Sequence, residues 1–570
     1  MLSVEQALTA KFPGFFEHQP RLVTTPLLKF FRLLFHEREI NQFLGENRGI
    51  GAFELVEKVL GYFNFGYAVS NLDRDNIPAV GRLVIVANHP LGALDALALI
   101  RLVSEVRRDL KVVANDLLMH IEPLRPLLLP VDNFAGGTRR DGIQRILEAL
   151  EREEAVIFFP SGEVSRAGPT GIRDGKWKSG FLNFAVKSGA PLLPVHIDAR
   201  NSLLFYGLST LYKPLAAVLL VHEMFKQHSK LVRFRVGEPI PARALQSPGL
   251  TPKAQVRLVR DHHRRIAKGK RGLFVTERAI AHPEERRAIK RELDGAERLG
   301  LTSDGRRIYL FDATADSALL REIGRLREVT FRAVGEGSGQ RRDLDGCDAT
   351  YRHLVLWDSD ALEVVGSYRI GEAGSIIARQ GLAGLYTHSL FDFHEDLIPL
   401  LEQGLELGRS FVQPRYWGSR ALDTLWQGLG AYLKSRPHIC YLFGSVSISN
   451  SYPAAAKALL VQLYRSHFGR AGLAEARQPY RMGNREQVLC EQIIGGVDYG
   501  TDFRAVKSQL AELGVTIPTL YKQYSELCEP GGVRFLDFNV DAAFQECIDG
   551  FLLVEVARIK ETKRRRYMGE

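Results

Sequence analysis

Residues 83–95, with the sequence LVIVANHPLGALD, constrain the fold of this chain more than any other stretch. The apolar run over 83–87 predicts a buried strand, Gly92 permits a tight turn after it, and Asp95 opens an apolar helical run. This order places the imidazole of His89 at the carboxyl end of a strand, with a carboxylate one helical turn away. Imidazole accepts a proton near neutral pH, and a carboxylate fixes its tautomer. The pattern therefore predicts a general base or, as the plainer alternative, a turn whose polar groups satisfy local backbone.

Short apolar runs alternate with helical patterns from residue 80 to about 240. The predicted strands cover 83–87, 111–114, 155–159, 192–197 and 231–236, and the predicted helices cover 96–108, 140–151 and 180–188. This alternation is typical of an α/β layered domain. Active groups in such domains lie in loops just past the strand ends, and the polar motifs of this region occur there.

Two further polar loops lie in the same region. In AVIFFPSGEVSR, a Pro-Ser-Gly break exposes backbone N–H groups beside charged side chains, which suits an anionic headgroup or a developing oxyanion. In LLLPVDNFAGGTRR, two arginines offer a clamp for an anion. A common strand exit and a solvated helix start are the plainer alternatives. The candidate binding residues are Asn88, Gly92, Arg139, Arg140, Ser161, Gly162, Glu163 and Arg166.

The length and charge of the chain bound its organisation and its partners. With 570 residues, the chain is too long for one ordinary core, so two or more domains are expected. The formal net charge of +10 favours anionic partners such as a membrane surface, a nucleic acid or an acidic carrier protein, although it also aids solubility. Five scattered cysteines form no C-x-x-C pair and fit a reducing cytosol. Nucleic-acid binding is not expected, because no basic motif with interleaved aromatic residues supports it.

The sequence argues against a membrane span and leaves peripheral contact with a membrane surface open. The start, MLSVEQALTAKFPG, lacks the features of a signal peptide, and charged residues and proline interrupt the apolar stretch 202–225. The segment 26–38, PLLKFFRLLFHER, predicts a basic helix with one apolar face, which suits the headgroup region of a membrane. A helix packed on the following domain is the plainer alternative.

Taken together, the motifs over roughly 60–245 resemble the glycerophospholipid acyltransferase family (1-acyl-glycerol-3-phosphate acyltransferase-like). NHPLGALD resembles its first block, PVDN…RR its second, FFPSGEVSR its third and PLLPVHI its fourth, in the family's order. Five residues instead of the usual four separate His89 from Asp95, as in the branch with H-P-x-G-x-x-D, and Ser161 and Glu163 flank the glycine of the third block. The resemblance implies an acyltransferase in which His89 is the base and Asp95 orients it.

The second half of the chain follows a different pattern. A predicted helix over 316–332, a Gly-rich loop and the antiparallel pair YRHLVLWD and LEVVGSYRI precede LELGRSFVQPRYWGSRALDTLWQGLGAYL. This element order resembles the GNAT superfamily of N-acyltransferases, in which a splayed strand pair presents backbone N–H groups to a thioester. The resemblance implies that a loop with Arg415, Gly418, Ser419 and Arg420 holds the pantetheine phosphate at a helix N-terminus. The loop has less glycine than a coenzyme A loop, which suits acyl carrier protein as the donor.

Residues 305–450 also resemble acyl-homoserine-lactone synthases and the ornithine N-acyltransferases that share their skeleton. The match rests on the spacing of Arg327, Phe331, Asp345, Asp348, Arg369, Glu406 and Arg409. The stretch PTLYKQYSELCEPGGVRFLDFNVDAAFQECIDGFLLVEV resembles the end of the ornithine-lipid synthases. The resemblance implies that Glu406, through a water molecule, takes the amine proton. It also implies that Asp345 and Asp348 attract the amino groups of ornithine. The carboxylate of ornithine would go to Arg369 or Arg409.

The expected fold class is α/β throughout, with an N-terminal glycerolipid-acyltransferase α/β domain and a C-terminal GNAT-fold α/β domain that has a mixed sheet. The expected parts are an amphipathic helical region over 1–70, an O-acyltransferase domain over 71–250, a charged helical connector over 251–304 and an N-acyltransferase domain over 305–570. Within the connector, the segment 273–299 is predicted to be helical.

The combined resemblance implies a bifunctional ornithine lipid synthase. The C-terminal domain would transfer a 3-hydroxyacyl group from acyl carrier protein to ornithine, and the N-terminal domain would then acylate the hydroxyl of lyso-ornithine lipid. No tightly bound cofactor and no metal is expected, and the protein would lie on the anionic inner face of the bacterial cytoplasmic membrane. The alternatives are glycine, serine or lysine as the acceptor, a lysophospholipid acceptor, or a non-catalytic protein that binds acyl carrier protein.

Overall fold

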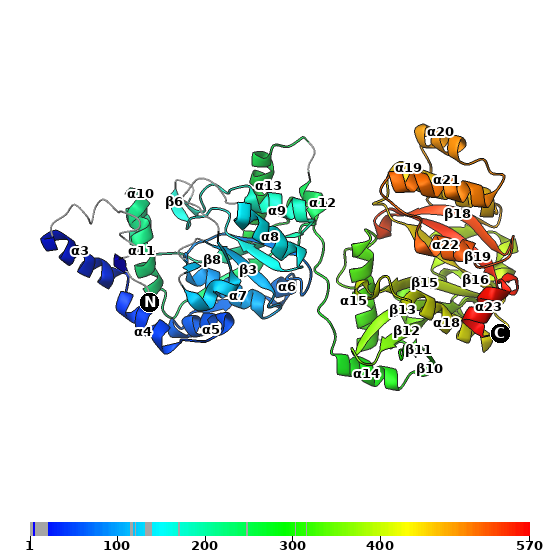
Figure 1. The fold of residues 1–570 in the computed structure, drawn as a ribbon, viewed down its shortest axis with the longest axis horizontal. Coiled ribbons are helices and arrows are strands. Elements are labelled where there is room, and N and C mark those ends of the chain that lie inside the picture. Colours follow the sequence, from blue (N-terminus) through cyan, green and yellow to red (C-terminus); the bar gives the residue numbers. More distant parts are fainter. Residues whose placement is uncertain are drawn as a thin grey trace. The chain divides into compact units, whose positions relative to one another are not determined.

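The computed structural model describes residues 4–5, 21–114, 118–119, 121–130, 140–168, 171–211, 213–246, 249–302, 304–314 and 316–569. The chain forms two compact units, Met1–Ala281 and His282–Glu570 (Figure 1). The boundary between the units therefore falls inside the segment 251–304. None of the helices in the described part of the chain is both long and apolar enough to cross a membrane.

The first unit is built on a seven-stranded sheet with the strand order β1-β9-β8-β2-β5-β3-β4. All neighbouring strands are parallel except β8 and β9. The strands are β1 (Gly66–Ala68), β2 (Leu83–Ala87), β3 (Leu110–Ala114), β4 (Leu128–Pro130), β5 (Ala155–Phe158), β8 (Leu192–Asp198) and β9 (Leu231–Val236), and β6 (Arg166–Gly168) and β7 (Gly171–Arg173) form a separate hairpin.

Helices cover both faces of this sheet. The helices of this unit are α3 (Arg21–Leu34), α4 (Glu37–Glu46), α5 (Ala52–Tyr62), α6 (Asn71–Arg74), α7 (Leu94–Ser104), α8 (Arg140–Glu151), α9 (Gly180–Ser188), α10 (Leu203–Leu211), α11 (Lys213–Phe225), α12 (Ala242–Leu245) and α13 (Pro252–Ala267). Leu83 and Ile85 of β2 pack with α5 and α7, whereas Val84 and Val86 pack with α8 and α9. Strand β2 is buried on both faces for this reason, which explains its unbroken apolar sequence.

The structure confirms the predicted strands and helices of this unit and corrects one helix. The predicted strand 83–87 and the predicted helices 140–151 and 180–188 have the observed bounds. The single helix predicted over 26–38 is instead divided between α3 and α4. His36 separates the two helices because its backbone is left-handed, with φ of 48°.

The second unit is built on an eight-stranded sheet with the order β10-β11-β12-β13-β15-β16-β19-β18. The strands are β10 (Glu297–Leu301), β11 (Arg307–Asp312), β12 (Arg352–Asp358), β13 (Glu363–Glu372), β15 (Gly404–Val412), β16 (Tyr441–Ile448), β18 (Val533–Asp541) and β19 (Cys547–Glu555), with β14 (Phe391–Phe393) and β17 (Ala474–Ala476) paired separately. The helices are α14 (Arg286–Asp294), α15 (Ala318–Ala333), α16 (Ala373–Gln380), α17 (Ile398–Glu402), α18 (Ala421–Lys434), α19 (Ala454–Phe468), α20 (Asn484–Ile493), α21 (Tyr499–Glu512), α22 (Thr519–Ser525) and α23 (Glu561–Met568).

Strands β15 and β16 separate along their length. They are parallel and pair over Gly404–Glu406 and Tyr441–Phe443, and these fully described strands have no further pairing with each other. The other neighbours in the sheet are antiparallel. The predicted helix 316–332 and the predicted hairpin are confirmed as α15 and the β12–β13 pair. Both units are therefore α/β, and the second has the mixed sheet that the sequence predicted.

The helix predicted over 273–299 is wrong for most of its length. Only Arg286–Asp294 of that stretch is helical, and Glu297 begins strand β10. Pro283 lacks a backbone N–H and disfavours the helical conformation of the residue before it, so a helix cannot run through this position without a break. The charged pattern of this stretch indicated a helix, but the proline decides where the helix begins.

Candidate active sites

His89 and Asp95 lie together at the carboxyl end of β2. Nδ1 of His89 lies 3.2 Å from Oδ2 of Asp95. The Asp95 side chain is fully buried, and its carboxylate accepts hydrogen bonds from the backbone N–H groups of Leu91 at 2.8 Å, Gly92 at 3.0 Å and Ala96 at 2.9 Å. These bonds fix the carboxylate at the start of α7, where the helix dipole favours negative charge. Asp95 therefore faces Nδ1 of His89, and Nε2 is the ring nitrogen that remains to take up a proton.

The electrostatics of this pair favour the charged forms of both groups. Burial alone raises the pKa of Asp95, but the nearby His89 and the backbone N–H groups outweigh it and lower the pKa. Burial lowers the pKa of His89, but the charges of Asp95 and Asp174 outweigh it, so the net pKa is raised above its ordinary value. His89 therefore keeps its proton to a higher pH than a free imidazole does.

Asp174 supports the His89 turn, although no local pattern in the sequence points to it. Its Oδ1 accepts hydrogen bonds from the His89 backbone N–H at 3.3 Å and from Ser165 Oγ at 2.6 Å, and its Oδ2 accepts one from Trp177 Nε1 at 3.1 Å. Ser165 in turn donates its backbone N–H to the carbonyl of His89 at 2.9 Å. The loop after β5 thus holds the backbone of His89 from the other side.

Gly92 is required by the geometry of the turn. Its φ is +97°, in the left-handed region that favours glycine. A Cβ added there would lie 2.7 Å from Leu220 of α11 and 2.8 Å from Val164. Any side chain at this position would therefore displace the turn that carries His89.

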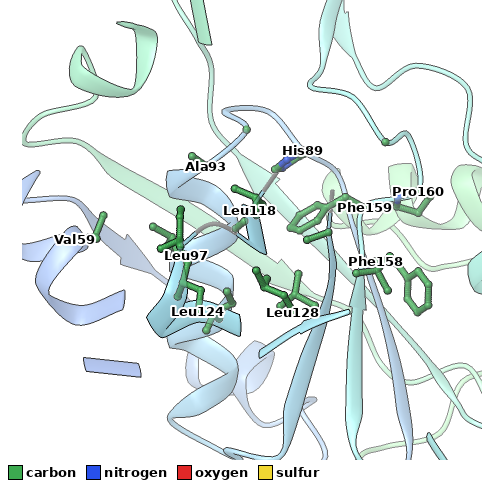
Figure 2. Close-up of a pocket in the computed structure, with 18 of the residues that line it drawn as sticks. Val59, His89, Ala93, Leu97, Leu118, Leu124, Leu128, Phe158, Phe159 and Pro160 are labelled. Carbon is green, nitrogen blue, oxygen red and sulfur yellow. The ribbon is translucent and has the colours of Figure 1, made fainter. Parts of the chain in front are cut away.

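A large apolar cavity opens beside His89. Its volume is about 1020 Å³, and it is lined by side chains of α4, α5, α7, α8, α9 and the ends of the central strands. Figure 2 shows Leu97, Leu124 and Leu128 toward one side of the cavity and Phe158 and Phe159 toward the other, with His89 above them. The His89 ring stacks on Phe159, with ring centroids 4.2 Å apart. Among the described residues, the titratable side chains in this lining besides His89 belong to Glu39, Tyr62, Lys178 and Lys187.

The other predicted residues of this unit bond to neighbouring protein groups. The side-chain amide of Asn88 exchanges two hydrogen bonds with the backbone of Ile197, so it joins β2 to β8. Ser161 Oγ donates to the carbonyl of Glu163 at 2.6 Å, and Arg166 pairs with the exposed Glu163 at 3.0 Å. Gly162, which has a φ of +63°, lines the cavity.

The predicted arginine clamp is not placed by the structure. Arg139 lies outside the described residues. Arg140 begins α8, and nothing further is described for it. The clamp therefore stays a prediction.

In the second unit, the predicted residues form a buried ion-pair network between α15 and the sheet. Arg327 is fully buried, and it binds Asp348 at 2.7 Å. Arg369 binds Asp345 at 2.5 Å and Asp348 at 3.3 Å. Burial alone raises the pKa of Asp348, but the two guanidinium groups outweigh it and hold the pKa well below its usual range. Asp348 also accepts the backbone N–H of Asp345 at 2.8 Å, so it is saturated by protein partners.

Arg409 lies at the edge of this network. It lies 3.4 Å from Asp343 and 3.3 Å from Asp345, and its guanidinium covers the rings of Tyr386 and Phe544. The φ of Arg409 is +49°, which is strained for a residue with a side chain. Arg409 lies at the position in β15 where its register with β13 shifts. Phe331 is part of the core and packs edge-on against Phe544 rather than facing solvent.

Glu406 lies where β15 and β16 begin to separate. It is 1 % exposed, and its carboxylate accepts hydrogen bonds from the Tyr351 hydroxyl and from the backbone N–H groups of Thr387 at 2.7 Å and Tyr386 at 3.2 Å. Burial raises the pKa of Glu406, and these hydrogen bonds only partly offset the rise. A carboxyl with a raised pKa is suited to accept a proton near neutral pH.

The predicted phosphate-binding loop is exposed at the start of α18. Gly418 has a φ of +75°, and Ser419 Oγ accepts the backbone N–H of Ala421 at 3.2 Å. Arg420 precedes the first helical residue, and Arg415 pairs with Glu363. The four predicted residues are thus brought together on the surface, beside the N-terminus of a fourteen-residue helix.

Comparison with known proteins assigns both units. Residues 6–269 match the family model described as Acyltransferase, and residues 326–427 match the model described as Acetyltransferase (GNAT) domain. A glycine N(alpha)-acyltransferase of Bacteroides thetaiotaomicron is 30% identical over 310 residues, which cover 51% of this chain and 89% of that protein. The chain belongs to the acyltransferases.

Two further relatives of this acyltransferase carry related names. A lyso-glycine lipid O-acyltransferase of Bacteroides thetaiotaomicron is 31% identical over 248 residues, which cover 42% of this chain and 89% of that protein. An L-ornithine N(alpha)-acyltransferase of Rhodobacter capsulatus is 34% identical over 189 residues, which cover 30% of this chain and 70% of that protein. The names describe transfer of acyl groups to amino acids and to their lyso-lipids.

Sequence reasoning missed several polar residues that lie beside the predicted residues of this acyltransferase or act on their neighbours. They are Asp174 in the first unit and Glu336, Tyr351, Tyr386, Asp541 and Asp549 in the second. A signal did exist for Asp549, because it is a lone carboxylate inside the apolar run CIDGFLLV. The pattern D-x-x-D at Asp345 and Asp348 also signals the capping box that the structure contains.

Removing Arg327 is expected to destabilise the GNAT unit of this acyltransferase strongly. Arg327→Met leaves the buried carboxylate of Asp348 with one fewer guanidinium partner, which costs about 3–5 kcal/mol when a buried pair is broken. Denaturant unfolding followed by circular dichroism measures the change in the free energy of unfolding. The exposed Arg379→Met should change it by less than about 0.5 kcal/mol. Equal stability of the two variants would contradict a structural role for Arg327.

Proposed function

We propose that this acyltransferase makes an aminolipid by two successive acyl transfers. The GNAT unit attaches a 3-hydroxyacyl group to the α-amine of ornithine, and the first unit then acylates the hydroxyl of the resulting lyso-lipid. The observation that carries the proposal is the His89–Asp95 pair beside an apolar cavity of about 1020 Å³. A base beside a cavity lined by apolar side chains suits a reaction in which the hydroxyl and the thioester carbonyl are each carried on an acyl chain.

In the O-acylation step, neutral His89 removes the proton of the lyso-lipid hydroxyl through Nε2. The oxygen attacks the thioester carbonyl, and the tetrahedral intermediate collapses with loss of the thiolate, which takes the proton back from His89. Asp95 fixes the ring and stabilises its charged form, as its 3.2 Å distance to Nδ1 allows. The step needs no covalent enzyme intermediate, since the chain has no G-x-S-x-G nucleophile elbow.

In the N-acylation step, Glu406 accepts the proton of the ornithine amine through a water molecule. The amine attacks the thioester carbonyl, an amide bond forms, and the leaving thiolate takes up the proton that Glu406 accepted. The separation of β15 and β16 frees backbone N–H groups beside Glu406 that can bind the carbonyl oxygen. Arg327 and Asp348 pair with each other and are almost fully buried, so we give them a positioning role and leave contact with the acceptor to Asp345, Arg369 and Arg409.

Acyl carrier protein is the proposed acyl donor, and no tightly bound cofactor is needed. The exposed loop before α18 offers Arg415, Ser419 and Arg420 to the phosphate of the 4′-phosphopantetheine arm. The basic balance of the chain favours the acidic carrier protein as well. Such a donor is delivered and released at each turnover, so it is a substrate and not a resident group.

The proposed location is the inner face of the bacterial cytoplasmic membrane. Phe30 and Leu33 of α3 are 58 % and 77 % exposed, and Leu203 and Leu204 of α10 are 87 % and 61 % exposed. Apolar side chains exposed on helices favour insertion at the headgroup boundary, and the positive charge of the chain favours an anionic surface. The lyso-lipid could then remain at the membrane surface between the two reactions.

The test supplies purified protein with ornithine, with carrier protein loaded with a 3-hydroxyacyl chain and with carrier protein loaded with a plain acyl chain, and detects the products by mass spectrometry. We expect lyso-ornithine lipid first and the diacylated lipid later. Glycine, serine, lysine and a lysophospholipid serve as competing acceptors, since some relatives are named for glycine. Formation of a glycine product alone would replace ornithine as the acceptor, and the absence of any acylated amino acid would overturn the proposal for the GNAT unit.

The pH dependence of O-acylation tests the role of Asp95. Because His89 must be neutral to act as a base and its pKa is raised, the rate should rise with pH through a value above 6.5. Asp95→Asn removes the charge that raises this pKa, so the rise should move to lower pH while the plateau falls by about 100-fold or more. A profile of kcat/KM from pH 5 to 9 measures both effects. If the rise keeps its position in Asp95→Asn, the titrating group is not His89.

A further inference from the structure

An acidic cluster of Glu336, Asp541 and Asp549 lies on one face of the second sheet. Asp549 of β19 lies directly opposite Ser447 of β16, and Asp541 at the end of β18 lies opposite Cys547. Directly opposed residues of neighbouring antiparallel strands share a face of the sheet. Glu336, in the loop after α15, accepts a hydrogen bond from Ser447 Oγ at 2.9 Å. The three carboxylates therefore gather around one position of the sheet.

The negative charge of this acidic cluster is not balanced within the protein. Asp549 is 6 % exposed, and no N–H or O–H group in the described part of the chain donates to its carboxylate. The Cys547 thiol, a weak donor, lies 4.0 Å away. Arg409 is the cation whose charge acts on Asp549, but it is already paired with Asp343 and Asp345. A buried carboxylate without a partner is costly, so the cluster calls for a cation.

The titration of the cluster agrees with this geometry. Burial and the charges of its neighbours raise the pKa of Asp549 well above its usual range. Burial raises the pKa of Glu336 to about 7. Both shifts are those of carboxylates that lack a nearby positive charge.

A metal ion does not fit the cluster, whereas an ammonium group does. In the described residues, no group of three or more His, Cys, Asp or Glu side chains is arranged to hold a metal ion. An ammonium group offers three donors that reach separate acceptors without the tight geometry that a metal requires. Such a group is found at the end of a lysine-like or ornithine-like side chain.

The guanidinium groups of Arg369 and Arg409, beside the cluster, suit the carboxylate of an amino acid whose side-chain ammonium group lies in the cluster. The Tyr386 ring lies 5.2 Å from the Arg369 guanidinium and 4.8 Å from that of Arg409, and the charges of Asp541 and Asp549 act on the same tyrosine. Arg369 is 1 % exposed, yet its Nε and one terminal nitrogen lack hydrogen-bond partners among the described residues. Donors of this kind, buried and unpaired, call for an anion such as a carboxylate.

We propose that Glu336, Asp541 and Asp549 bind the side-chain ammonium group of the acceptor and so select a diamino acid over glycine. The inference rests on the proposed N-acylation by the GNAT unit and specifies its acceptor. Tyr386 would lie between the two charged ends of the acceptor, with its backbone N–H bonded to Glu406. The α-amine of the acceptor, on the carbon that joins its carboxylate to its side chain, then faces Glu406.

The test compares ornithine with 2-aminopentanoic acid, which has the same carbon chain without the terminal amine. For the full-length protein we expect kcat/KM for N-acylation to be at least about 100-fold higher with ornithine, because the analogue leaves the carboxylates unpaired. Asp549→Asn and Glu336→Gln should lower the value for ornithine by about 30-fold or more and lower it much less for the analogue, so that discrimination collapses. Calorimetric titration with each amino acid in the absence of donor gives a second, independent measure of binding.

Controls separate this inference from misfolding and from failure of the proposed reaction. Glu555→Gln changes a carboxylate of the same strand that pairs with Arg534 outside the cluster, and it should keep the discrimination of the natural sequence. The Asp549→Asn protein should melt at an equal or higher temperature, since it loses an unbalanced buried charge. Equal use of ornithine and the analogue by the unaltered protein would overturn the inference, as would an equal loss for both in Asp549→Asn. Binding of ornithine without any acylation would support the cluster and overturn the reaction, and the absence of both would overturn the two together.

Discussion

Replacing His89 by alanine is expected to lower the rate of O-acylation by about 10²- to 10⁴-fold and to leave N-acylation intact. The imidazole is the group that lines the apolar cavity beside a fully buried carboxylate, so its loss removes the base without opening the core. The GNAT unit has its own cores and its own polar network, which this substitution does not touch. Lyso-lipid should therefore accumulate, and mass spectrometry of the lipids measures its ratio to the diacylated product.

The matched control for His89 is another histidine of the same unit. His228 is exposed and lies outside the cavity lining, so His228→Ala should keep the lipid ratio of the unaltered protein. Circular dichroism and a thermal melt establish that both variants are folded. Normal amounts of diacylated lipid from the His89→Ala protein would mean that the first unit uses a different base.

Replacing Glu406 by glutamine is expected to lower N-acylation by about 10²- to 10⁴-fold, because an amide cannot accept the amine proton. Without lyso-lipid, the diacylated product should disappear as well. Added lyso-lipid should restore O-acylation, since His89 is unchanged. The exposed Glu402→Gln, four residues earlier in the chain, is the control that keeps both activities.

A second variant distinguishes a base from a structural carboxylate. The Tyr351 hydroxyl donates to Glu406 and thereby lowers the pKa that burial raises. Tyr351→Phe removes this bond, so the pH at which N-acylation rises should move upward. If the profile keeps its position, or if Glu406→Gln retains its activity in a folded protein, the base lies elsewhere.

Local patterns predicted the elements around the first site because their bounds are set by nearby residues. The apolar run of β2 ends at Asn88-His89-Pro90, and Asp95 lies in the first turn of α7, so strand, turn and helix follow from thirteen residues. The contact of Asp174 with the His89 backbone joins positions that are 85 residues apart, and no local pattern encodes it. The helix predicted over 273–299 failed for a local reason, since charge spacing was weighed above Pro283.

The second site was predictable in its residue types but not in their partners. The spacing of Asp345, Asp348, Arg369 and Arg409 indicated a charged site, and the structure brings them together. The same spacing could not tell that Arg327 and Asp348 neutralise each other inside the fold. The acidic cluster depends on which residues of β16, β18 and β19 lie opposite each other, and this register is set by long-range pairing.

The left-handed backbone of Arg409 restricts which residues can replace it. A residue with a Cβ costs about 1 kcal/mol or more in this conformation, and the contacts of the guanidinium offset that cost. Alanine would keep the strain and lose the contacts, whereas glycine would relieve the strain as it removes the side chain. Arg409→Gly is therefore the cleaner deletion. Most other side chains at this position would keep the strain without the contacts of the guanidinium, so they would loosen the sheet first at the bulge in β15.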